Sequence, residues 1–278
     1  MCGAVACFAF LDTTAKYLNH YMDTLQVVWA RYMSAFVLTL FISNPVSRPG
    51  LVRTSRPVLQ IGRAMLLLLS SVFNFLALRY LQLDEVLAIM FSQPFLVAIL
   101  AGPILGEWVG WRRWIAIGAG FIGVLVVTRP GYGGMHPAAL FALASALCLA
   151  LYGIATRALA RTDSNETTLL YSNMVGALMM LPVLPLVWTN PGDWFLVGLM
   201  ALMGALGSFG HYLLIAGHRG APASVLAPFM YTQLVWVAAL GYLVFGNVPN
   251  RWTLAGAAIV IGSGLYLFHR ERVRGKIV

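Results

Sequence analysis

The sequence predicts an all-α integral membrane protein whose ten transmembrane helices form two inverted five-helix repeats. Three observations lead to this prediction: 60% of the 278 residues are hydrophobic, only 10% are charged, and long apolar runs recur from one end of the chain to the other. A soluble protein carries roughly 25% charged residues, because its surface faces water. We therefore expect lipid to surround most of this surface.

Ten apolar runs approach or reach the roughly 20 residues that a helix needs to cross a bilayer. The connections between them are short and rich in Pro, Gly, Asn and Ser, as in SNPVSRPG and TNPGD, which is typical of turns. No connection has room for a soluble domain. The predicted spans are Met1–Leu18, Gln26–Ile42, Leu59–Tyr80, Glu85–Leu105, Trp111–Thr128, Pro137–Ala158, Thr167–Trp188, Trp194–Gly217, Ala221–Phe245 and Trp252–Phe268.

The basic residues predict the orientation, since cytoplasmic connections carry an excess of Lys and Arg. With the N-terminus inside, only Arg79, Arg129 and Arg251 fall outside, and Lys16 and Arg31 lie within spans. The other basic residues fall inside: Arg48, Arg53, Arg56, Arg63, Arg112, Arg113, Arg157, Arg161, Arg219, Arg270, Arg272, Arg274 and Lys276. We therefore predict a multi-pass protein of the bacterial inner (plasma) membrane with both termini cytoplasmic, and we expect no nucleic-acid partner. The first apolar run has no basic leader, which argues against a signal peptide.

Short matches between the two halves of the chain predict the repeat. Val86-Leu87-Ala88 matches Val225-Leu226-Ala227, and RWIAIGA from Arg113 matches RWTLAGA from Arg251. We expect a first repeat at 1–133 and a second at 134–278 that ends in a short basic cytoplasmic tail. Five helices in each half force opposite orientations. Secondary transporters use this plan, with the site near the membrane midplane between the halves.

The stretch FLALRYLQLDEVLAIMFSQPFLVAILAGPILGE resembles the EamA-type family of the drug/metabolite transporter superfamily. The features that carry the resemblance are Ala77-Leu78-Arg79-Tyr80, Pro94 and Gly106-Glu107; the second half departs from it with Gly246-Asn247. The resemblance covers nearly the whole chain. It implies a ten-helix exporter of small metabolites, most of all aromatic or other neutral amino acids, that works without an organic cofactor. Drugs, nucleoside-like compounds and cationic metabolites are the alternative substrates.

Ionisable residues within predicted spans are costly and indicate function or specific pairing. Asp12 and Lys16 are four residues apart on one helix face, so they either neutralise each other or leave Asp12 to meet a substrate ammonium or a proton. Arg31 either binds neighbouring helices and the interface or receives a substrate carboxylate. His211 either packs in the interior or carries a proton.

Gln93-Pro94 interrupts an apolar run, and we interpret the pair as a bend in the wall of a central cavity. Gln233 occupies nearly the same level in the second half, where proline comes earlier, at Pro228. Uncharged polar groups, aromatic rings and methionines cluster at these levels and suit a permissive pocket. The predicted substrate-binding residues are Phe8, Asp12, Phe73, Asn74, Met90, Gln93, Tyr152, His211, Met230 and Gln233, and the predicted hinges are Pro94 and Pro228.

Small residues in GAGFIG (118–123) and GAAIVIGSG (256–264) favour close helix packing. We expect these two helices to pair, either within one chain or between two. The pattern leaves a monomer or a weak homodimer open.

Two other function classes fit the sequence poorly. A membrane-embedded enzyme needs a nucleophile with a base, a metal cluster or paired carboxylates, and neither H-E-x-x-H nor G-x-S-x-G occurs. No His or Cys has metal-ligand spacing, so we expect neither a metal nor a catalytic residue. A channel usually needs rings of polar groups around a pore, which one asymmetric chain does not offer.

Overall fold

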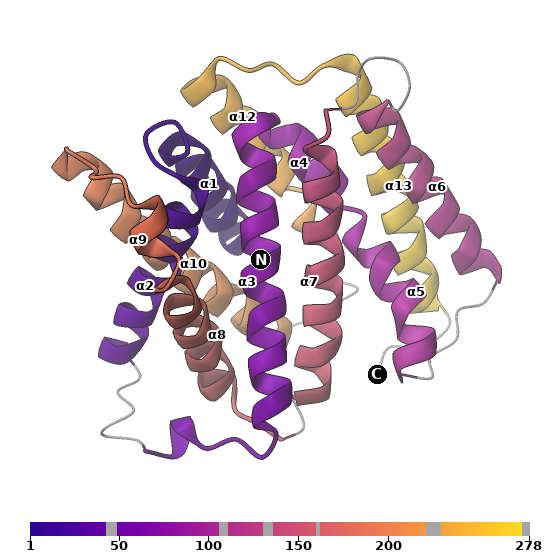
Figure 1. Cartoon of the computed structure of the whole chain (residues 1–278). Coiled ribbons are helices and arrows are strands. Elements are labelled where there is room, and N and C mark those ends of the chain that lie inside the picture. The colour runs from indigo at the N-terminus through magenta and orange to yellow at the C-terminus, as the bar shows by residue number, and fades with distance from the viewer. Residues whose placement is uncertain (43–48, 106–110, 130–135, 160–161, 221–228, 274–278) are drawn as a thin grey trace.

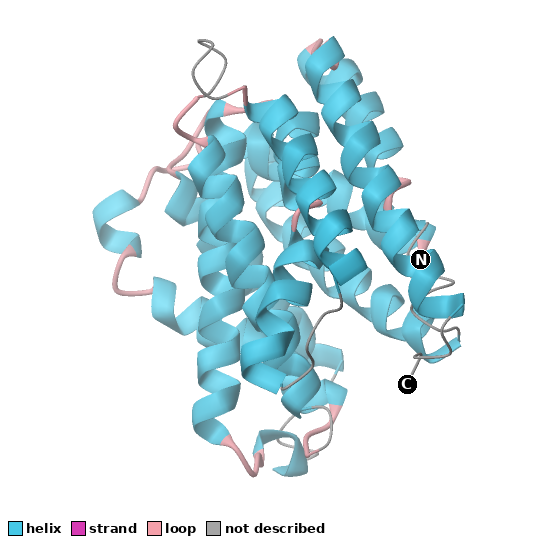
Figure 2. Cartoon of the chain, turned by 90° about the vertical axis from the view of Figure 1, so that its right-hand side faces the viewer, coloured by secondary structure: helices cyan, strands magenta, loops and turns pink. Residues whose placement is uncertain are grey.

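The computed structural model is helical and describes residues 1–42, 49–105, 111–129, 136–159, 162–220 and 229–273 (Figure 1). Within these residues there is no β-strand. Figure 2 shows the longer helices running side by side along the long dimension of the molecule. The elements are α1 (Cys2–Leu18), α2 (Thr24–Ile42), η1 (Pro49–Val52), α3 (Pro57–Tyr80), α4 (Leu83–Met90), α5 (Gln93–Leu105), α6 (Trp111–Thr128), α7 (Ala139–Leu159), α8 (Asn165–Met180), α9 (Leu184–Val187), α10 (Trp194–Gly220), α12 (Gln233–Phe245) and α13 (Arg251–Val273).

In the described part of the chain, four stretches of helix are each long and apolar enough to cross a membrane: Thr24–Ile42, Pro57–Tyr80, Ala139–Leu159 and Trp194–Leu214. Large apolar side chains also project outward, and Trp194 is 87% exposed. Many exposed large apolar side chains are costly in water and favourable in lipid. The all-α membrane class that the composition predicts is therefore supported.

The predicted bend at Gln93-Pro94 is a break between two helices. α4 ends at Met90, and the Ser92 carbonyl accepts the N–H groups of Phe95 and Leu96 at 3.0 and 3.1 Å. Pro94 is thereby the second residue of α5. Proline costs nothing at this position, because the first N–H groups of a helix have no helical acceptor. The prediction of a kinked continuous helix is corrected to two helices joined by a two-residue turn.

A second predicted span, Thr167–Trp188, is also divided. α8 ends at Met180, and the short helix α9 follows at Leu184–Val187. Pro182 lies in the gap, where it cannot donate to the preceding turn and stops the helix. The predicted hinge Pro228 and the predicted boundary between residues 133 and 134 lie outside the described residues.

The main helix contacts join the first half of the chain to the second. α3 packs on α7 and α8, α2 on α8 and α10, α1 on α10 and α12, and α6 on α13. Figure 1 shows α3 beside α7 at the centre and α6 beside α13 at the right. These contacts are symmetric if the helices correspond in the order α1 to α7, α2 to α8, α3 to α10 and α6 to α13. The α3–α7 contact then becomes α1–α10 and the α3–α8 contact becomes α2–α10, while α2–α8 and α6–α13 are unchanged.

The crossing of α6 and α13 depends on two glycines. A Cβ atom at Gly123 would lie 2.9 Å from the Gly256 carbonyl oxygen, and one at Gly256 would lie 2.6 Å from the Gly123 carbonyl oxygen. The backbones therefore meet directly, as small-residue motifs allow. The structure places the predicted pairing of these two helices within one chain.

Candidate functional site

One face of α3 carries polar side chains through most of its length. Gln60, Arg63, Ser71 and Asn74 follow one another at multiples of three or four residues, so they share a face. We call these four residues the α3 polar stripe. Polar groups buried in a membrane protein need partners, and the stripe finds them in turn on α8, α7, α2 and α1.

The first end of the stripe is tied to the connection between α7 and α8. Gln60 donates from Nε2 to Asp163 Oδ2 at 2.7 Å, and the Thr54 hydroxyl donates to the same oxygen. Gln60 also reaches the Thr168 hydroxyl at 3.3 Å. These bonds hold the start of α3 against the start of α8.

Arg63 is the next residue of the stripe and is only 1% exposed. It donates from Nη1 to the Thr156 hydroxyl at 3.1 Å, and from Nη2 to the Thr168 carbonyl at 2.7 Å and to the Ser172 hydroxyl. Its guanidinium carbon lies 4.7 Å from the centre of the Tyr152 ring. Its Nε has no hydrogen-bond partner. No carboxylate forms an ion pair with Arg63 among the described residues, so this buried cation is held by neutral groups alone.

The charge count for topology treated Arg63 as a residue of a connection, and the structure corrects this. α3 begins at Pro57, which suits the first helical position, so Arg63 lies well inside the helix. Tyr152, predicted to bind substrate, is the ring beneath this arginine.

At mid-stripe, Ser71 joins α3 to α2. The Tyr32 hydroxyl lies 2.8 Å from the Ser71 hydroxyl and donates to the Leu67 carbonyl at 3.0 Å. Arg31 donates from Nη1 to the Ser71 hydroxyl, and its guanidinium carbon lies 5.1 Å from the Tyr32 ring centre and 5.7 Å from that of Phe75. Arg31 is thus oriented into the helix assembly.

The far end of the stripe meets α1. Asn74 donates from Nδ2 to Asp12 Oδ1 at 3.0 Å. Lys16 donates from Nζ to the Leu78 carbonyl at 2.7 Å and to the Leu81 carbonyl at 2.6 Å, which satisfies the C-terminal end of α3. The interpretation in which Lys16 pairs with Asp12 is therefore wrong. The geometry leaves the Asp12 carboxylate with an amide as its hydrogen-bond donor.

Two further predicted residues lie together between α1 and α10. The rings of Phe8 and His211 are 5.1 Å apart at an interplanar angle of 64°. Both side chains are half-buried. Phe73, in contrast, stacks on Phe141 of α7 with ring centres 6.3 Å apart, so packing accounts for its position.

The predicted glutamines each begin a helix. Gln93 is the first residue of α5 and Gln233 the first of α12. The rings of Phe91 and Tyr231, two residues before each glutamine, meet at 5.1 Å with an angle of 77°. The starts of α5 and α12 thus approach each other, with the half-buried Met90 and Met230 close by in the sequence.

Sequence reasoning missed several members of this network, among them Gln60, Arg63, Ser71, Tyr32 and Ser172. A usable signal was present, because the polar residues of the predicted span Leu59–Tyr80 recur at helical spacing. In the part of the chain that the structure describes, no three His, Cys, Asp or Glu side chains gather as metal ligands would.

Comparison with known proteins decides the family. The sequence model of the EamA-like transporter family matches residues 1–129 and 136–268. The chain belongs to the EamA-like transporter family. The resemblance noted in the sequence is therefore confirmed over the whole of both matched stretches.

Several relatives of this EamA-family chain are named for metabolite transport. It is 29% identical to the S-adenosylmethionine uptake transporter of Rickettsia prowazekii, over 94% of this chain and 88% of that protein. It is 25% identical to the riboflavin transporter of Vibrio cholerae, over 99% and 94%. It is 22% identical to the pseudopaline exporter CntI of Pseudomonas aeruginosa, over 91% and 89%.

The fold is also found in a solved structure. One crystal structure aligns with 99% of this chain and 97% of its own, at a TM-score of 0.60 and 17% identity. Family membership and the relatives together point to a small-molecule transporter rather than an enzyme. With the apolar helices, they indicate a membrane protein of bacteria.

The bonds around Asp163 predict a pH effect on stability. Burial raises the pKa of this carboxyl, but hydrogen bonds from Thr54 and Gln60 lower it more, so its pKa lies below the usual range. A depressed folded-state pKa stabilises the fold above the unfolded value of about 3.9, and this stabilisation is lost as the pH falls through the folded pKa. We expect the thermal midpoint of the wild type in detergent to fall below about pH 4, and the midpoint of Asp163→Asn to fall less. Parallel curves for the two proteins would contradict this.

Proposed function

We propose that this protein is a secondary transporter that carries amino-acid-type metabolites across the bacterial inner membrane by alternating access. Ten segments would cross the membrane as two inverted five-helix repeats, 1–133 and 134–278, with both termini in the cytoplasm. Two features support this arrangement: the family matches a stretch in each half, and the main helix contacts between the halves map onto one another when the halves are exchanged. One chain supplies both halves of the site, so we propose a working monomer, with a weak homodimer as the alternative.

The observation that carries the proposal is the set of charges along the α3 polar stripe. Two arginines, Arg31 and Arg63, bond to hydroxyls and carbonyls, while Asp12 accepts from an amide. These are groups of both signs within a membrane protein, where unpaired charge is costly. A zwitterion matches them: its ammonium would meet Asp12 and its carboxylate would meet an arginine.

The helix breaks supply further polar groups for such a ligand. Discontinuous helices commonly form substrate sites in transporters, and their N-terminal ends favour the anionic part of the substrate. The starts of α5 and α12, at Gln93 and Gln233, are two such ends. Phe8 and His211 offer a flat aromatic contact to an apolar or ring-bearing portion.

S-adenosylmethionine is the first substrate to test, since relatives at 29% identity are named for its uptake. It has an amino-acid head and an aromatic base, so it fits both parts of the proposed site. Aromatic and other neutral amino acids share the same head and form the second candidate group. We propose facilitated movement with weak or no proton coupling, because Asp12 is the one carboxylate in the middle of a predicted span. Export then follows when the solute is more concentrated inside.

Flux into proteoliposomes tests this proposal. We expect saturable uptake of labelled S-adenosylmethionine, with competition from compounds that keep the amino-acid head. Decarboxylated S-adenosylmethionine and phenethylamine are the matched controls for S-adenosylmethionine and phenylalanine. Each should bind at least about tenfold more weakly than the compound that keeps the carboxylate, because a hydrogen bond to a charged group contributes about 1.5–3 kcal/mol. Equal competition by the decarboxylated compounds, or no flux across the panel, would refute the proposed substrate class.

A further inference from the structure

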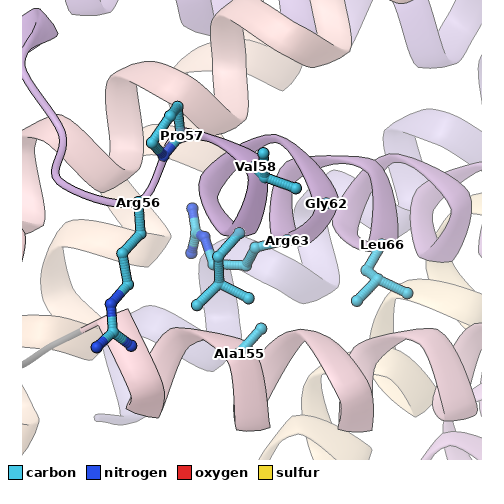
Figure 3. A pocket seen from close by; sticks show the side chains of 8 residues that line it. Arg56, Pro57, Val58, Gly62, Arg63, Leu66 and Ala155 are labelled. Carbon is cyan, nitrogen blue, oxygen red and sulfur yellow. The ribbon is translucent and has the colours of Figure 1, made fainter.

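A groove opens on the exterior of the helix bundle, between the first turns of α3 and the last turns of α7. Its volume is about 670 Å³, and its lining comes from α3, from Arg56 just before it, and from Ala155 of α7 (Figure 3). The walls are apolar, with Val58, Leu59 and Leu66 among the lining residues. Val58 is 84% exposed, so the groove faces the surroundings of the protein and not its interior.

The two polar residues of the groove are both cationic. Arg56 is exposed and stands directly before α3, and Figure 3 shows its side chain extending towards the end of α7. Arg63 lies beneath the groove and carries the buried charge described above, with its Nε unpartnered. Among the residues that the structure describes, no acidic side chain lines the groove. The groove is therefore mostly apolar, and Arg56 gives it a positive charge at one end.

The start of α3 carries charge of both signs, since the Asp163 carboxylate is bound there by Thr54 and Gln60 while the helix itself contributes unpaired N–H groups. No side chain caps its first N–H groups. The first N–H groups of a helix and its dipole both favour an anion. A ligand that fits must join an anionic head to an apolar tail.

We propose that the groove between α3 and α7 binds an anionic glycerophospholipid from the cytoplasmic leaflet. The phosphate would lie at Arg56 and the start of α3, and an acyl chain would run along Leu59, Gly62 and Leu66. Basic pockets between transmembrane helices on the cytoplasmic side bind such headgroups. Arg56 lies on the side that the charge distribution places in the cytoplasm, which is where anionic lipid would meet it.

Arg63 belongs both to the lining of the groove and to the α3 polar stripe. A bound lipid would therefore stabilise the helix that carries the stripe. Lipid binding is nevertheless measured without transport, so it stands or falls separately from the proposed substrate.

Native mass spectrometry of the purified protein with phosphatidylglycerol and phosphatidylcholine tests the site. We expect the wild type to retain phosphatidylglycerol preferentially, and Arg56→Gln to bind it about fivefold more weakly. Gly62→Leu should fill the groove and reduce the retention of both lipids. A Cβ at Gly62 meets no atom within 4 Å, so the fold is expected to accept the change.

Arg53→Gln and Gly198→Leu are the matched controls. Arg53 is an exposed arginine outside the groove lining, and a Cβ at Gly198 of α10 also meets no atom within 4 Å. Both controls should keep wild-type retention. Equal retention of the two lipids by the wild type, or an Arg56→Gln protein that binds like Arg53→Gln, would overturn the proposal. Displacement of the lipid by equimolar glycerol 3-phosphate would also overturn it, because the apolar wall would then contribute nothing.

Discussion

Asp12→Asn is expected to reduce transport of S-adenosylmethionine about tenfold or more while leaving the protein folded. The substitution keeps the size of the side chain and its contact with Asn74 but removes the negative charge. A hydrogen bond to a charged group contributes about 1.5–3 kcal/mol, which corresponds to a factor of roughly ten or more. The measurement is initial flux into proteoliposomes over a range of substrate concentrations.

Asp23→Asn is the matched control. Asp23 lies before α2, its side chain is 37% exposed, and it forms a loose ion pair with Arg79 at 3.8 Å. Exposed pairs of this kind contribute little, so flux should stay near the wild-type value. A deaminated substrate analogue should be carried equally by the wild type and by Asp12→Asn. Unchanged S-adenosylmethionine flux in Asp12→Asn would remove Asp12 from the substrate site.

Gly256→Val is expected to lower the stability of the protein much more than Gly262→Val in the same helix. Its Cβ would lie 2.6 Å from the Gly123 carbonyl oxygen and 3.0 Å from the Val127 amide nitrogen. Those atoms are backbone, so α6 and α13 must move apart. Overpacking costs about 1–3 kcal/mol even where side chains relax. We expect a large fall in the thermal midpoint and a loss of monodisperse protein in detergent.

Gly262→Val, in the same helix, separates steric contact from helix propensity. A Cβ at Gly262 meets no atom within 4 Å, so this change should be nearly neutral. If Gly256→Val and Gly262→Val have the same thermal midpoint, the backbones of α6 and α13 do not meet at Gly123 and Gly256.

Composition and periodicity predicted the helix positions well, because the bilayer demands long apolar runs. Helices lie in every predicted span, and α1, α3 and α6 begin within two residues of the prediction. The breaks were harder to predict. Pro94 sits at the start of α5 and not inside a helix, since the residues before it form a turn that the apolar pattern does not reveal.

The site was predicted in pieces. Asp12 and Asn74 were both named, and the structure brings them to 3.0 Å. Their partnership depends on how α1 crosses α3, which a single sequence does not contain. Spacing along α1 offers Lys16 as one of two alternatives for Asp12, yet Lys16 bonds to carbonyls at the end of α3, because the unpaired end of that helix lies within its reach.

Arg63 was overlooked for a different reason. A charged residue near the end of an apolar run is normally assigned to the connection, where water solvates it. Arg63 lies near the start of the predicted span Leu59–Tyr80, and in the structure it is a buried residue of α3, where Thr156, Ser172 and the Tyr152 ring replace the water.

We propose that the α3 polar stripe lines a path that opens to each side of the membrane in turn. Modification of a single cysteine at Ser71 tests it most directly, in a protein whose Cys2, Cys7 and Cys148 are replaced by alanine. Ser71 is 3% exposed in this structure, so a membrane-impermeant thiol reagent reaches it only when the path opens. We expect modification of Ser71→Cys from either side of the membrane, and S-adenosylmethionine should slow it. Absence of modification from one side, or rates that the substrate leaves unchanged, would contradict it.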